Sequence, residues 1–181
     1  PLHTDSGEYP IHQAVYVYSN NWNMTENQKK KNNEITEEIL DLLILNSNDH
    51  DYINSRDEDG HTPLYNATKQ KKLEIVKILV HKFNAKIDVT GFIANDKYLP
   101  KDKYGYHTGD TKRDNEFSPL SVQLRHSSYI LNPSYNICDF YLNDEINISN
   151  NNIANINEID NLGFSHLMYA THQGKIALVQ Y

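Results

Sequence analysis

The segment 57–68, with the sequence DEDGHTPLYNAT, constrains the fold of this chain more than any other part. Gly60 suits a tight turn that needs a positive φ angle. Thr62 can accept a backbone N–H bond at the start of a helix, and Pro63 stands at the first helical position, where its missing N–H costs nothing. The segment therefore predicts a turn that leads directly into a helix.

Apolar residues continue at helical spacing after this start. Leu64 and Ala67 fall three residues apart on one helical face, and the small alanine allows a second helix to approach closely. A second apolar stripe follows, formed by Ile75, Val76, Leu79 and Phe83. The stretch 57–88 is thus predicted to be a helix–turn–helix unit, which can bury its apolar side only against similar units.

The same frame recurs three times along the chain. It is found at Gly7 to Ala14, from Phe117 to Ser121, and from Asp160 to Ala170. Apolar stretches that can form the second helix follow each start, at 35–45, 137–142 and 176–179. The chain is therefore predicted to contain four related units in tandem.

This frame resembles the ankyrin repeat, in the turn glycine Gly60, in Thr62-Pro63-Leu64 and in the ending Asn84-Ala85-Lys86-Ile87-Asp88. The resemblance implies an all-α solenoid of stacked helix–turn–helix repeats with β-turn fingers and long inserted loops. The expected repeats in this single domain (1–181) are 4–54, 57–88, 113–147 and 160–181. The repeat starts lie roughly 50 residues apart, whereas an ankyrin repeat has about 33 residues. The difference predicts insertions at 19–33, 89–113, 127–134 and 147–156, and the chain is expected to be a fragment of a longer protein.

Charge and cysteine content exclude several classes of function. A net charge of −7 makes binding to nucleic acid through its phosphates a poor expectation. The single cysteine, Cys138, rules out an internal disulfide and fits a reducing compartment, so a cytoplasmic location is expected. No apolar run is long enough to predict a membrane span.

No group of residues in the sequence predicts catalysis, a metal site or a bound cofactor. The acidic stretch that starts at Asp57 lacks the glutamate of a calcium loop, since Thr68 stands at its twelfth position. Cys138 falls at an apolar core position, which is typical of a buried free thiol. By the resemblance, His12 occupies the slot of a structural histidine that braces a loop by hydrogen bonds. We therefore expect a protein that is not an enzyme.

The resemblance implies a scaffold that binds a partner protein through its concave face, its fingers and its insertion loops. The expected contact residues are Glu8, Tyr16, Glu58, Asp59, His61, Lys69, Asn115, Phe117, Arg125, His126, Leu162, Phe164 and His172. A monomer is expected, and an effector acting in the cytoplasm of a host cell is one form that such a scaffold can take. The alternative is the substrate-recognition domain of a multidomain enzyme whose catalytic domain lies outside this chain.

Overall fold

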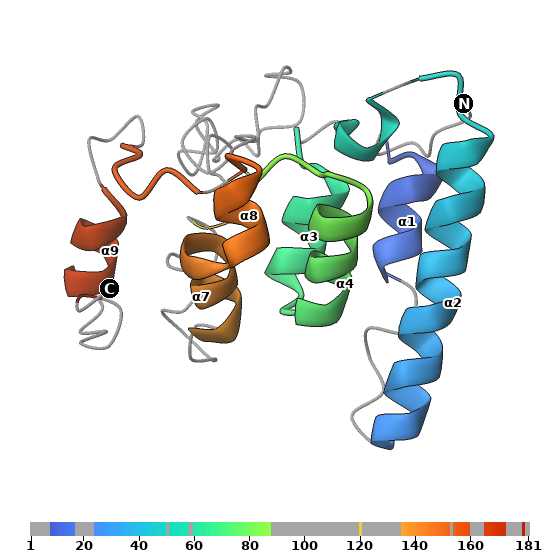
Figure 1. Cartoon of the computed structure of the whole chain (residues 1–181), viewed down its shortest axis with the longest axis horizontal. Helices are drawn as coiled ribbons and strands as arrows, with labels where there is room; N and C mark the ends of the chain where they lie inside the picture. The colour runs from blue at the N-terminus through green and yellow to red at the C-terminus, as the bar shows by residue number, and fades with distance from the viewer. Residues whose placement is uncertain are drawn as a thin grey trace, which may run out of the picture.

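The computed structural model of the chain is mostly helical. It describes residues 8–16, 24–49, 51–57, 60–87, 120, 135–152, 154–159, 165–172 and 179. Within these residues there is no β-strand, and extended pairing is limited to an antiparallel bridge between Ile159 and Ser165. The helices lie side by side in groups that follow one another in chain order, as Figure 1 shows. No helix in this described part is long and apolar enough to cross a membrane.

The first helix pair consists of α1 (Pro10–Tyr16) and α2 (Glu26–Leu45), which pack against each other. The prediction of an inserted loop at 19–33 is wrong from residue 26 onward, because the 20-residue helix α2 starts at Glu26. A reciprocal cap explains this start. The Gln28 amide donates to Thr25 Oγ1 at 3.3 Å, and the Thr25 amide donates to Gln28 Oε1 at 2.8 Å.

The extra turns of α2 are polar and exposed, so they carry no apolar periodicity that sequence reasoning could detect. Three lysines, Lys29 to Lys31, are part of this helix. Figure 1 shows α2 extending beyond the ends of the neighbouring helices. After α2, the short 3₁₀ helix η1 (Tyr52–Asn54) leads to the start of the second pair.

The second pair begins with α3 (Pro63–Lys69), as the sequence predicted. Thr62 caps it, with its Oγ1 accepting the Tyr65 amide at 3.2 Å, and Pro63 occupies the first turn. Gly60 has a φ of 76°, in the left-handed region that its turn requires. The predicted start of this unit is thereby confirmed.

The second helix of this pair changes its winding halfway. It begins as α4 (Leu73–Lys77) and continues as a π-helical turn, η2 (Ile78–Lys82). The stripe formed by Ile75, Val76 and Leu79 is buried, as predicted, and α4 packs against both α3 and α2. The π turn has no signature in the apolar spacing.

Three further helices follow in the described residues: α7 (Tyr135–Asn143), α8 (Glu145–Ser149) and α9 (His166–His172). Helix α7 contains the second helix predicted for the third unit, and it packs against α4, whereas α8 packs against η2. The insertion predicted at 147–156 overlaps the last turn of α8. The predicted insertions 89–113 and 127–134 lie outside the described residues, as does most of the first helix of the third unit.

One continuous apolar core joins the helix pairs. It extends from Ile11 and Val15 of α1, through Leu64 and Leu79, to Tyr141 of α7, all of them buried. The Tyr141 hydroxyl forms a buried hydrogen bond with Thr68 Oγ1 of α3. The apolar side of one pair is thus covered by the next pair, which is the arrangement expected of stacked units.

Asparagine side chains link the loops that follow the second helices. Asn54 Oδ1 accepts the Lys86 amide at 2.9 Å. Asn152 makes two such bonds, with Oδ1 accepting the Ile87 amide at 3.1 Å and Nδ2 donating to the Ala85 carbonyl at 2.9 Å. A side-chain amide here supplies the donor and the acceptor that a neighbouring β-strand would supply.

Replacement of Lys71 by glycine is expected to stabilise the fold. Lys71 lies between α3 and α4 with a φ of 60°, a conformation that costs a residue other than glycine about 1 kcal/mol or more. Lys71→Gly should raise the free energy of unfolding by about 0.5–1 kcal/mol in urea denaturation. The matched control, Lys69→Gly in the last turn of α3, should lower it by a similar amount. A Lys71→Gly chain less stable than the parent would show that the contacts of the lysine side chain outweigh the backbone strain.

Candidate functional site

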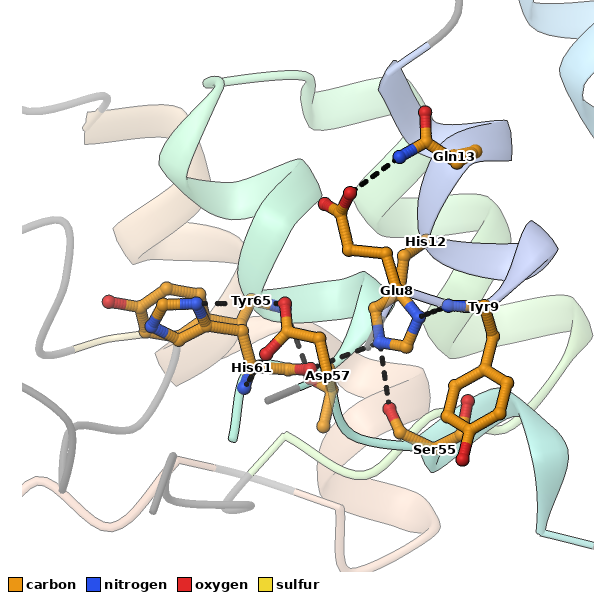
Figure 2. Close-up of polar contacts among 9 residues, drawn as sticks. Glu8, Tyr9, His12, Gln13, Ser55, Asp57, His61 and Tyr65 are labelled. Atoms are coloured by element: carbon orange, nitrogen blue, oxygen red, sulfur yellow. Dashed lines mark hydrogen bonds and ion pairs between the residues drawn. The ribbon is translucent and has the colours of Figure 1, made fainter. Parts of the chain in front are cut away.

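The junction between the first two helix pairs is built around His12 of α1, a buried histidine. Its Nδ1 accepts the Tyr9 amide at 3.1 Å, and its Nε2 lies 3.0 Å from the carbonyl oxygens of both Ser55 and His61. Figure 2 shows the ring between α1 and the loop that precedes α3. The expectation that His12 braces a loop by hydrogen bonds is confirmed.

These three contacts determine the protonation state of the ring. Two carbonyl oxygens require a proton on Nε2, and the Tyr9 N–H requires a lone pair on Nδ1. Burial lowers the pKa of His12 below its ordinary value of 6.5, although the carbonyl bonds and the nearby Glu8 carboxylate act in the opposite direction. His12 is therefore a neutral structural donor, and not a group ready to exchange protons with a substrate.

His61, one of the predicted contact residues, is held within the turn that starts α3. Its ring stacks on that of Tyr65 with centroids 4.1 Å apart and an interplanar angle of 6°. Its amide donates to Asp57 Oδ1 at 2.8 Å, and Nδ1 lies 3.8 Å from Asp57 Oδ2. The His61 side chain is only 12% exposed, so the small surface that it offers a partner has a fixed orientation.

The other described contact residues lie at the ends of first helices. Glu8 precedes α1 and is half-buried, and its Oε2 accepts a hydrogen bond from Gln13 Nε2 at 2.6 Å. Tyr16 ends α1 and Lys69 ends α3, and these two helices pack against each other. Lys69 is exposed, as is His172 at the end of α9. The structure thus brings Tyr16 and Lys69 onto neighbouring helices, while His172 belongs to a helix at the far end of the molecule in Figure 1.

The remaining predicted contact residues lie outside the described part of the chain, and their role stays a prediction. They are Glu58, Asp59, Asn115, Phe117, Arg125, His126, Leu162 and Phe164.

Lys72 is a junction residue that sequence reasoning missed. Its Nζ reaches across from the second pair and donates to the Val15 carbonyl, in the last turn of α1, at 2.5 Å. A cation at this end of a helix meets unpaired carbonyls and the negative end of the helix dipole. Burial lowers the pKa of Lys72 to about 8. A run of lysines in the sequence gave no signal that one of them turns inward.

Ion pairs on the second helices complete the contacts between pairs. Lys82 of η2 donates to Glu37 and Asp41 of α2, at 2.6 and 2.7 Å. The preceding residue, His81, lies 2.9 Å from Asp144 at the start of α8. Two successive residues of the π turn therefore reach opposite neighbours.

The single cysteine of the chain, Cys138, is a buried free thiol. Burial raises the pKa of the Cys138 thiol to about 12, so the thiolate that a nucleophile needs is not formed at neutral pH. No cluster of His, Cys, Asp and Glu that could hold a metal ion occurs in the described ranges.

The family model of the ankyrin repeat matches residues 59–92. The matched segment contains α3, α4 and η2 and agrees with the unit predicted at 57–88. This part of the chain is similar to an ankyrin repeat, and the match confirms the resemblance that its sequence predicted. A comparison with curated proteins finds no match.

Loss of the His12 ring is expected to weaken the junction strongly. His12→Ala removes three hydrogen bonds and leaves two carbonyls and one N–H without their partner. The free energy of unfolding should fall by about 2–4 kcal/mol in urea denaturation, compared with about 0.5 kcal/mol or less for the exposed neighbour Gln13→Ala. Equal losses for the two variants would contradict the bracing role of His12.

The same histidine should make stability depend on pH. The unfolded chain takes up a proton on His12 near pH 6.5, but the folded chain does so only at lower pH, because its pKa is lowered. Stability should therefore fall as the pH drops below 6.5, and it should fall less steeply in His12→Gln, which lacks the group. Urea midpoints between pH 7.5 and 5.5 measure this difference. An NMR titration in which the His12 ring is protonated above pH 6.5 would disprove it.

Proposed function

We propose that this chain, which carries an ankyrin repeat, is a non-enzymatic module that binds a partner protein. The observation that carries the proposal is the ankyrin match at 59–92, because ankyrin repeats act as protein–protein interaction modules. The stacked helix pairs and their common core support extending this reading to the units on either side. The full arrangement that we propose is a solenoid of four repeats with β-turn fingers.

The binding surface that we propose lies on the first helices and the fingers. Tyr16 and Lys69 end the neighbouring helices α1 and α3, which supports a shared contact surface there. Phe117 and Phe164 stand in the predicted fingers of the third and fourth units. Aromatic side chains supply much of the binding energy at protein interfaces, so these two residues are the strongest candidates for anchors.

The buried free thiol of Cys138 is compatible with a reducing compartment, so we place this activity in the cytoplasm. An effector acting in a host cell remains one form of the proposal, and it depends on the identity of the partner.

The proposal is tested with an immobilised chain that captures proteins from a cytoplasmic extract, followed by affinity measurement with the captured partner. Phe117→Ala, Phe164→Ala and Lys69→Ala should each weaken binding, by about fivefold or more for an aromatic anchor. Their melting temperatures should stay close to that of the parent. The matched control is Glu38→Ala, an exposed position on α2. If the phenylalanine variants unfold, these side chains belong to the core, and the proposed surface is wrong.

A further inference from the structure

A groove of about 670 Å³ lies between the second helices of the second and third units. On one side it is lined by Leu73 and Lys77 of α4. On the other side it is lined by residues of α7 and the start of α8: Asn136, Asp139, Phe140, Asn143, Asp144, Glu145 and Ile146. This volume falls within the range of about 300–1,000 Å³ in which proteins bind ligands. None of the described lining residues belongs to the first helices α1, α3 and α9.

The apolar part of the groove is accessible. Phe140 is buried, with its ring 5.1 Å from that of His81, whereas Ile146 is 50% exposed. Leu73 is half-buried on the opposite wall. An aliphatic side chain placed here would cover Ile146 without any rearrangement of the core.

The charged part of the groove is acidic. Among the described lining residues there are three carboxylates, those of Asp139, Asp144 and Glu145, and one lysine, Lys77, whose Nζ lies 3.2 Å from Glu74. Lys77 is thus already matched by an anion of its own helix. The described lining of the groove thus carries more negative than positive charge, which a basic ligand would complement.

Asp144, one of the three carboxylates, is held in place by hydrogen bonds. Its Oδ1 accepts the amides of Ile146 and Asn147 at 3.1 Å and lies 2.9 Å from His81 Nε2. Burial by itself would raise the pKa of Asp144, but these hydrogen bonds and the nearby His81 lower it below its ordinary value. Asp144 therefore keeps its charge as the cap of α8, and the next lining residue, Glu145, is exposed.

We propose that this groove docks a basic amphipathic segment of a partner protein, with an aliphatic side chain against Ile146 and Leu73 and a lysine or arginine beside Asp139 and Glu145. The apolar side chains of such a segment would contact the apolar wall, and its basic side chains would pair with the carboxylates. An acidic segment would be repelled by the same carboxylates. This second contact surface does not depend on the proposed concave surface.

The test uses two synthetic peptides and the ¹⁵N-labelled full chain. One peptide alternates leucine pairs with lysine and arginine, and the other has glutamate at each basic position. The basic peptide should shift the amide resonances of Leu73, Lys77, Phe140 and Ile146, and the acidic peptide should leave them unchanged. The proposal would be overturned if both peptides shifted these resonances, or if the basic peptide shifted only resonances of residues outside the groove.

Variants separate the groove from general attraction to an acidic protein. The double variant Asp139→Asn with Glu145→Gln should weaken the basic peptide about threefold to tenfold, since exposed ion pairs are individually weak. Ile146→Ser should also weaken binding of the basic peptide, and far-UV circular dichroism should confirm that the fold is intact.

The matched control, Glu34→Gln with Glu38→Gln, removes two exposed carboxylates of α2 and should leave the affinity unchanged. Equal weakening by the two double variants would show that only net charge is being measured. None of these substitutions touches Lys69, Phe117 or Phe164, so the two surfaces fail or succeed independently.

Discussion

The hydrogen bonds of His12 hold together the junction on which the rest of the structure depends. One imidazole ring connects the start of α1 to the carbonyls of Ser55 and His61, which flank the turn leading into α3. That turn places Thr62 and Pro63 where they can start the next helix. The start of the second helix pair therefore depends on a side chain of the first pair. The same geometry places α1 and α3 side by side over their common apolar core.

The junction between the second and third pairs uses different chemistry. Tyr65 stands where the second unit would have the equivalent of His12, and its ring stacks on His61. The connection is made instead by the buried pair of Thr68 and Tyr141 and by the loop bonds of Asn152. The chain is rich in asparagine, and at Asn54 and Asn152 the side-chain amide joins two segments of backbone.

The sequence predicted the parts of the fold that depend on local chemistry. The cap at Thr62, the proline at Pro63 and the apolar stripe of α4 follow from neighbouring residues, and the structural role of His12 follows from the resemblance. The extra turns of α2 were missed because they contact solvent, and solvent leaves no apolar period. The π turn and the stacking of His61 on the nearby Tyr65 leave no signature in the apolar spacing. The inward course of Lys72 was missed because its acceptor, the Val15 carbonyl, is distant in the sequence. The acidic groove was missed for the same reason, since α4 and α7 come together only in the folded chain.

The π turn at residues 78–82 has a mechanical consequence. By directing His81 toward α8 and Lys82 toward α2, it ties one short stretch of backbone to the units on both sides. A chain of units coupled only through nearest-neighbour contacts tends to fray from its ends. Here the second unit cannot open without breaking the Lys82 ion pairs on one side and the contact of His81 with Asp144 on the other. Local opening of the second unit therefore costs polar contacts with the units on both sides, and these contacts couple its stability to that of its neighbours.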